Sequence, residues 1–87
     1  MNLPVWAVKN VEPREDYSLV IYFADGSKKL YNAKPLLDDE MYEPLKNLPF
    51  FMKASALCGT VVWSDDIDIA PEHLYEESLP IYEAENP

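Results

Sequence analysis

Alternating apolar and polar positions predict a chain built mostly from short strands. Residues 5–11 are rich in β-branched side chains, which favour strands, and Pro13 removes a backbone donor soon afterwards. Residues 17–24 give the strongest strand pattern, because both alternating faces are substantially apolar. A strand of that kind is typical of the centre of a sheet. We therefore expect residues 17–24 to form a central strand.

A tight turn is predicted directly after this strand, at the Asp-Gly pair of residues 25–26. A two-residue type I′ turn needs positive φ at both positions, and this pair suits it. The register that follows places Lys29 opposite Tyr22, on the face away from the core. The third strand is then expected over residues 28–33.

The middle of the chain carries a weaker helical pattern. The acids at 38–40 resemble a helix start, but Pro44 would break the hydrogen-bond ladder of a helix that began there. We therefore predict a short helix over residues 43–47, with Pro44 at its first position and Pro49 ending it.

A second tight turn is predicted at the Cys-Gly pair of residues 58–59. It leads into a clear strand at 60–63, which is rich in β-branched residues. Residues 51–57 fit either a strand or a helix. We favour a strand there, because a tight turn most often joins two strands.

The last predicted element is a helix over residues 71–78. Pro71 suits the first helical position, and Ile69 and Leu74 have the spacing of a hydrophobic staple. Asp68 lies just ahead of this helix, so we expect its carboxylate to accept hydrogen bonds from free N–H groups of the first turn.

These elements predict one small α+β domain over residues 1–82, with an antiparallel sheet of about five strands and one or two short helices. Residues 83–87 are predicted to form a flexible tail. A chain of 87 residues has room for one core. Its apolar stretches fall short of the ~20 residues that a membrane span needs, and its start has no signal-peptide pattern, so we expect a cytoplasmic protein.

The charge is unevenly distributed along the chain. The net charge is −9, and residues 54–87 hold eight of the sixteen acids with no Lys or Arg. All seven basic residues lie in residues 1–53, which are nearly neutral. A phosphate backbone or an anionic lipid would be repelled by the second part. We therefore expect no direct nucleic-acid or membrane binding, and a basic surface of a protein partner suits this chain better.

Four acids within eight residues form the densest candidate site, at Asp65, Asp66, Asp68 and Glu72. Carboxylate oxygens can hold a divalent cation, although the pattern lacks the glycine and distal glutamate of a calcium loop. Turn formation and helix capping explain the same acids without a ligand. We predict no cofactor.

Catalytic groups are sparse in this sequence. His73, the only histidine, can serve as a general base beside Glu72 or Asp68, but no nucleophile motif accompanies it. Cys58, the only cysteine, has no basic neighbour in the sequence to activate its thiol. We therefore expect a protein that is not an enzyme.

Two motifs resemble a known family. Residues 23–26 read F-x-D-G, and residues 63–75 read W-x4-D-I-x-P-E-x-L-Y. The chain resembles the short bacterial domains of unknown function of family 2442 over nearly its whole length. The resemblance implies a small α+β domain with antiparallel strands and no established activity. It also implies a protein partner, because members are often encoded beside another short family in an arrangement similar to toxin–antitoxin pairs.

The leading interpretation is a small non-catalytic binding or accessory domain that contacts a protein partner, as the antitoxin-like member of a two-gene pair. The alternative is a small-ligand or divalent-metal-binding domain that uses the acids of residues 65–72. A homodimer is left open, since the strand at 5–11 can pair at a sheet edge with a second copy. Aromatic residues at element ends fit either an interface or the core. The predicted contact residues are Trp63, Asp65, Asp66, Asp68, Glu72 and Tyr75.

Overall fold

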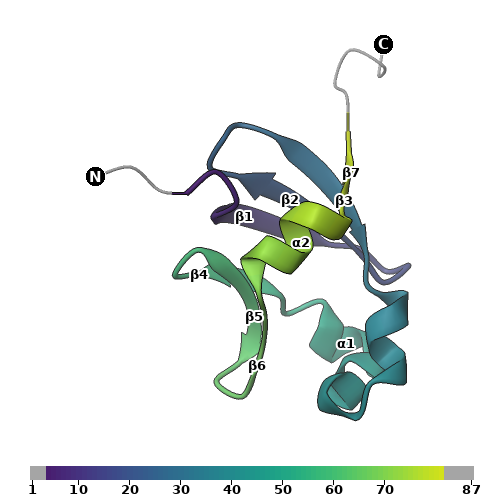
Figure 1. The fold of residues 1–87 in the computed structure, drawn as a ribbon. Coiled ribbons are helices and arrows are strands. Elements are labelled where there is room, and N and C mark those ends of the chain that lie inside the picture. Colours follow the sequence, from purple (N-terminus) through teal and green to yellow (C-terminus); the bar gives the residue numbers. More distant parts are fainter. Residues whose placement is uncertain (1–3, 82–87) are drawn as a thin grey trace.

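The computed structural model describes residues 4–81, and the predicted tail at 83–87 lies outside the described residues. Strands, two short α-helices and two 3₁₀ helices (η) make up this part of the chain, so the predicted α+β class is confirmed (Figure 1). None of these helices is long and apolar enough to cross a membrane. The elements are β1 (Val8–Pro13), β2 (Ser18–Phe23), β3 (Lys28–Asn32), η1 (Lys34–Asp38), η2 (Glu40–Lys46), α1 (Leu48–Phe51), β4 (Ser55–Leu57), β5 (Thr60–Ser64), β6 (Ile67–Ile69), α2 (Pro71–Glu77) and β7 (Leu79–Pro80).

The strands form two antiparallel sheets instead of the single sheet that we predicted. A four-stranded sheet has the order β1-β2-β3-β7, and a three-stranded sheet has the order β4-β5-β6. The two sheets meet where the N–H of Val8 donates to the carbonyl of Gly59 at 2.8 Å. The estimate of about five strands was too low, because β6 and β7 are three and two residues long and show no periodicity of their own.

The central position predicted for residues 17–24 is confirmed. β2 lies between β1 and β3, and Leu19, Val20 and Ile21 are all buried, although they alternate between its two faces. The first strand begins later than predicted, because residues 5–6 form a turn. It also runs through Pro13, which ends β1 opposite Leu19, so Pro13 belongs to the strand.

The hairpin between β2 and β3 differs from the predicted type I′ turn. The N–H of Phe23 donates to the carbonyl of Ser27 at 2.9 Å and closes a three-residue loop. Gly26 has a φ of 88°, whereas Asp25 keeps a negative φ, which a type I′ turn does not allow at that position. The Asp25 carboxylate accepts the N–H of Ser27 at 2.8 Å and so stabilises the longer loop.

The longer loop shifts the register of β2 and β3 by one residue. Tyr22 lies opposite Lys28, and Ile21 lies opposite Lys29, so the predicted pairing of Tyr22 with Lys29 is wrong. A slip of one residue exchanges the two faces of a strand. Lys29 therefore shares the face of the buried Ile21.

The helical part between the two sheets is longer than predicted. A helix was expected over 43–47, but η2 begins at Glu40, after the Asp39 carboxylate caps it by accepting the N–H of Met41 at 2.9 Å. Pro44 lies inside η2. Because η2 is a 3₁₀ helix, it lacks the i→i−4 hydrogen-bond ladder that a proline breaks in an α-helix.

Pro49 belongs to a helix, α1 (Leu48–Phe51), instead of ending one. It lies in the first turn of α1, and the side chain of Asn47 caps that turn by accepting the N–H of Phe50 at 3.1 Å. Residues 51–57 are divided between the two predicted alternatives. Phe51 ends α1, and residues 55–57 form β4.

The two remaining local predictions are confirmed. Cys58 and Gly59 have φ values of 53° and 81°, as a two-residue hairpin with positive φ at both positions requires. The final helix, α2, starts at Pro71, one residue shorter at its end than predicted. Ile69 and Leu74 are both buried, in agreement with the staple.

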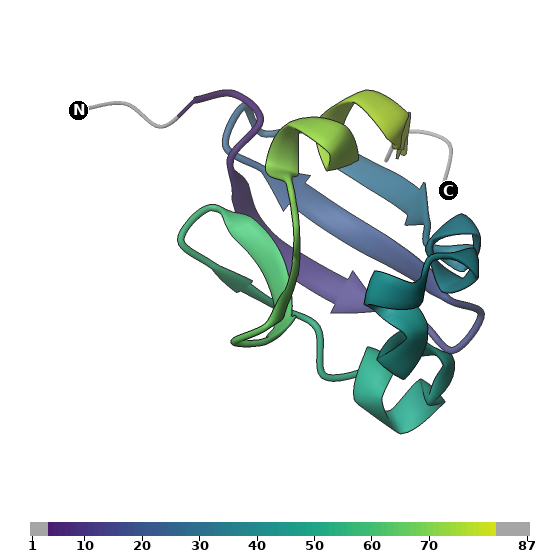
Figure 2. The ribbon, with the colours of Figure 1, turned by 60° about the horizontal axis from the view of Figure 1, so that its bottom comes forward.

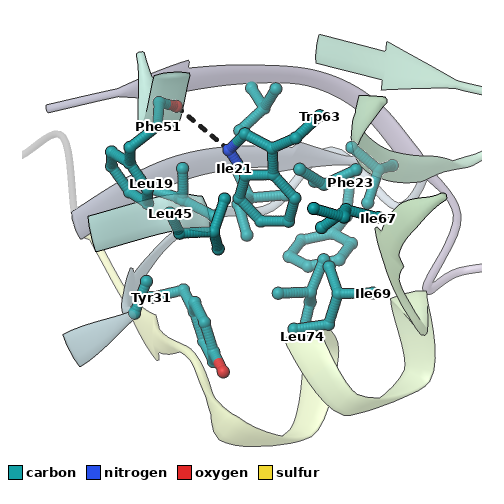
Figure 3. Close-up of a cluster of buried hydrophobic side chains, with 14 residues drawn as sticks. Leu19, Ile21, Phe23, Tyr31, Leu45, Phe51, Trp63, Ile67, Ile69 and Leu74 are labelled. Atoms are coloured by element: carbon teal, nitrogen blue, oxygen red, sulfur yellow. Dashed lines mark hydrogen bonds between the residues drawn. The ribbon is translucent and has the colours of Figure 1, made fainter. Parts of the chain in front are cut away.

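The core lies between the four-stranded sheet, the three-stranded sheet and α2, with the helical residues 34–51 gathered at one end (Figures 1 and 2). Figure 3 shows side chains from both sheets and from η2, α1 and α2 converging there. Burial of such apolar surface is the main source of stability in a domain of this size. The largest fully buried side chains are Phe23, Phe51, Leu19, Ile21, Leu45, Leu74, Val20 and Val61.

Candidate functional site

Trp63, one of the predicted contact residues, belongs to the core. Only 6% of its surface is exposed, and its indole N–H donates to the carbonyl of Phe51 at 3.0 Å (Figure 3). Its ring also lies against the Phe51 ring, with centroids 6.1 Å apart. Trp63 therefore joins β5 to the end of α1, and it is not available on the surface for a partner.

The four predicted acids are all exposed. Asp65 and Asp66 lie in the turn between β5 and β6, Asp68 lies on β6 and Glu72 lies in the first turn of α2. The capping role expected for Asp68 is wrong. Ala70 is the residue at the helix N-cap, and no side chain caps α2 there. Asp68 belongs to β6, the strand that precedes α2, so its carboxylate does not cap the helix.

Tyr75 connects α2 to the β2–β3 hairpin through several contacts. Its hydroxyl donates to Asp25 Oδ2 at 2.7 Å, and its ring meets the Phe23 ring edge to face at 5.0 Å. Lys29 Nζ lies 3.6 Å from the centroid of the Tyr75 ring and donates to the Tyr75 carbonyl at 3.1 Å. Half-buried among these contacts, Tyr75 has a mainly structural role.

These contacts change the titration of both oxygen groups. Hydrogen bonding from Ser27 and from Tyr75 lowers the pKa of the Asp25 carboxyl to about 2. The same hydrogen bond, followed by burial, raises the pKa of the Tyr75 hydroxyl. At neutral pH, the pair is therefore a carboxylate that accepts from a protonated phenol.

His73 does not pair with either of the acids that the sequence placed beside it. Its Nε2 lies 3.0 Å from the hydroxyl of Tyr31, and the two rings meet nearly edge to face, with centroids 5.7 Å apart. Figure 3 shows the Tyr31 hydroxyl directed away from the apolar cluster. Burial, followed by Tyr42 and Glu77, raises the pKa of Tyr31 to about 12, so this phenol is protonated at neutral pH.

One acid from the middle of the chain, Asp39, lies close to residues of the segment 65–77. The Tyr42 hydroxyl donates to the Asp68 carbonyl at 3.1 Å, which ties η2 to β6. Burial, then the charges of Asp68 and Asp39, raise the pKa of Tyr42. Asp39 and Glu77 also line one hollow beside Tyr31. We use the name acidic surface for the exposed carboxylates of Asp39, Asp65, Asp66, Asp68, Glu72, Glu76 and Glu77.

Sequence reasoning missed Tyr31, Asp39 and Glu77 as site residues. The spacing of His73 and Glu77 was available as a pattern, because residues four apart lie on one helix face. No local pattern pointed to Tyr31 or Asp39, since each lies far from α2 along the chain.

Among residues 4–81, no three His, Cys, Asp or Glu side chains come together to hold a metal ion. The acids of residues 65–72 are spread over a turn, a strand and a helix, and all four are exposed. Calcium or magnesium needs six or more oxygen ligands converging on one point, with bound water in place of some of them.

A second hollow, of about 530 Å³, lies at the opposite end of the fold, where β1 meets the β4–β5 turn. Trp6, Val8, Lys9 and Cys58 are among the residues that line it. Cys58 is exposed, and its thiol is free. Among the residues that the structure describes, no carboxylate lines this hollow, in contrast to the acidic surface.

Comparison with known proteins settles the family. The sequence pattern of the family described as "Protein of unknown function (DUF2442)" matches residues 8–80, which is most of the chain. This chain belongs to the DUF2442 family. Comparison with curated proteins and with solved structures gives no match.

Several residues in the motif that resembles DUF2442 hold this fold together. Trp63, Ile69 and Leu74 are buried in the core, Pro71 begins α2, and Tyr75 joins α2 to the hairpin. The motif of this DUF2442 chain thus describes how β5, β6 and α2 pack. Its exposed members, Asp68 and Glu72, are the ones free to contact another molecule.

Proposed function

We propose that this protein is a small, non-catalytic accessory domain that binds a protein partner through its acidic surface. The partner presents a basic patch, and the two form an antitoxin-like pair encoded together. The observation that carries the proposal is the exposure of the acids of residues 65–77 in a part of the chain that contains no Lys or Arg. Complementary potentials of this kind steer association and select the partner.

Further properties of this proposal follow from the same charges. We place the domain in the cytoplasm and expect no direct contact with nucleic acid or with a membrane, because both are polyanionic. A homodimer remains part of the proposal, with pairing along the outer edge of β1 beyond Val8, whose own N–H already donates to the carbonyl of Gly59. The resemblance to family 2442 supports a protein partner through the gene arrangement of its members.

We expect affinity purification of the tagged protein from its own cell at low salt to recover a stoichiometric basic protein. Association should weaken as salt rises past ~0.15 M, where the screening length falls below about 8 Å. Mass spectrometry and the stoichiometry on a sizing column provide the measurement. If no stoichiometric partner is recovered at low salt, the proposal is wrong.

A matched pair of variants separates the acidic surface from the overall charge. Asp65→Asn with Asp66→Asn removes two charges from the β5–β6 turn, and Glu12→Gln with Glu15→Gln removes two exposed charges from the β1–β2 end. The first pair should reduce recovery of the partner, whereas the second should leave it unchanged. Equal losses would point to net charge as the cause.

The alternative of a divalent-metal site at residues 65–72 is tested by thermal melts. We expect the melting temperature to stay the same when about 1 mM calcium, magnesium, manganese or zinc is added, because a ligand stabilises only when it binds the native state. Differential scanning calorimetry on metal-free protein provides the measurement. A rise that saturates with one of these ions, and that Asp68→Asn abolishes, would support the alternative.

A further inference from the structure

The hollow beside Tyr31 has a volume of about 340 Å³, and two carboxylates of the acidic surface, Asp39 and Glu77, line it. Three segments enclose it: the end of β3 with the start of η1, the cap of η2, and the exposed face of α2. Its lining includes Tyr31, Pro35, Leu36, Asp39, His73 and Glu77.

Two carboxylates reach this hollow from different sides. Asp39 Oδ1 accepts the N–H of Met41 at 2.9 Å, and the second oxygen is left for another donor. Glu77 is exposed near the end of α2. Asp39 is the N-cap of η2 and Glu77 is the last residue of α2, so the two carboxylates come from different elements.

The rest of the lining is apolar or aromatic except for Asn32, whose side-chain oxygen accepts the N–H of Lys34 at 3.1 Å. Pro35 and Leu36 offer apolar surface, and the His73 imidazole is held edge-on to the Tyr31 ring by their 3.0 Å contact. The high pKa of Tyr31, about 12, keeps its phenol uncharged, so Asp39 and Glu77 supply the negative charge among the lining residues. The exposed His73 ring, an aliphatic side and two carboxylates together complement a long side chain that ends in a flat cation.

We propose that this hollow binds an arginine side chain of the protein partner, an inference that rests on the proposed function. The guanidinium is planar, stacks on aromatic rings and forms paired hydrogen bonds with carboxylates, whereas a lysine ammonium is a compact, strongly hydrated point charge. The aliphatic stem of the arginine lies along Pro35 and Leu36, and the guanidinium lies between Asp39 and Glu77.

A titration followed by NMR tests the site directly. The probe is N-acetyl-arginine methylamide, added at constant ionic strength, and the reporter is the imidazole of His73, which is the only histidine in the chain. We expect saturable shifts of the His73 and Tyr31 ring resonances. The citrulline analogue, which has the same shape without the charge, should cause no saturable shift, and the lysine analogue should bind more weakly.

Isosteric variants assign the binding to the two carboxylates. Glu77→Gln or Asp39→Asn should each weaken binding of the arginine probe by about tenfold, which corresponds to about 1.4 kcal/mol for a charge-assisted hydrogen bond. Asparagine at position 39 keeps the oxygen that caps η2. The control is Glu76→Gln, which removes an exposed charge from the same helix outside this lining and should change binding by less than about twofold.

Three outcomes would overturn the inference: no saturable shift with the arginine probe, an equal shift with the citrulline analogue, or equal losses in Glu76→Gln and Glu77→Gln. The same variants separate this inference from the proposed function. If the purified partner binds Glu77→Gln and Asp39→Asn as tightly as the unmodified protein, the hollow is not where it docks, although the partner exists. If the arginine probe binds and no partner is recovered, the site stands and the proposed function fails.

Discussion

Replacing Trp63 with alanine is expected to lower the free energy of unfolding by about 3–5 kcal/mol, the usual cost of deleting a large buried aromatic ring. The indole is 6% exposed and fills the space between β5 and α1. A small domain has little stability in reserve, so the variant should be partly unfolded at 37 °C. Urea unfolding followed by circular dichroism gives the measurement.

Two further variants locate the origin of this loss. Trp63→Phe removes the N–H that donates to the Phe51 carbonyl. Loss of this hydrogen bond should lower the free energy of unfolding by about 1 kcal/mol, beyond the effect of the smaller ring. The cost stays small because the Phe51 carbonyl also accepts the N–H of Ala54 at 3.2 Å. Trp6→Ala serves as the control, since Trp6 is only half-buried. A stable Trp63→Ala protein that no longer binds its partner would make Trp63 a contact residue after all.

Replacing Tyr75 with alanine is expected to lower the free energy of unfolding by about 2 kcal/mol, because a half-buried ring, a hydrogen bond and a cation–π contact are lost together. The contact of its ring with Lys29 Nζ at 3.6 Å and the edge-to-face contact with Phe23 both disappear. Tyr75→Phe keeps the ring and removes only the hydroxyl, so it isolates the hydrogen bond to Asp25. Equal losses in the two variants would show that the ring contacts contribute nothing.

The hydrogen bonds that Asp25 accepts, from Ser27 first and then from Tyr75, also make the stability of the protein depend on pH. Folding lowers the pKa of Asp25 from 3.8 to about 2, so the folded state holds the carboxylate more strongly than the unfolded state does. The resulting stability is present above the unfolded pKa and is lost as the pH falls toward 2. The stability difference between the unmodified protein and Asp25→Asn should therefore be constant above about pH 5 and shrink below it. A difference that grows with acid would contradict the assignment.

The predictions that depended only on residues close together in the sequence were confirmed most often. The turn at residues 58–59 needs only two residues that tolerate positive φ, and the start of α2 needs only a proline at its first position with apolar residues five apart around the cap. The central position of β2 followed from apolar side chains on both of its faces.

The predictions that failed depended on contacts that the local pattern does not contain. The Asp-Gly pair at 25–26 fits both a two-residue and a three-residue hairpin loop, and the choice moved Lys29 to the core face. Asp is a residue type that often caps a helix, but Asp68 belongs to a strand because β6 pairs with β5. Trp63 was likewise predicted as a contact residue, whereas packing against α1 buries it.

The sequence by itself determined the fold class, the central strand, the last helix and the acidic character of residues 54–87, because each follows from composition or from contacts between near neighbours. Only the tertiary structure decided which acids gather around one hollow. Tyr31 and His73 are 42 residues apart along the chain, and Tyr42 and Asp68 are 26 apart. Such contacts depend on how β3, η2 and α2 pack over a shared core, and no local propensity encodes that packing.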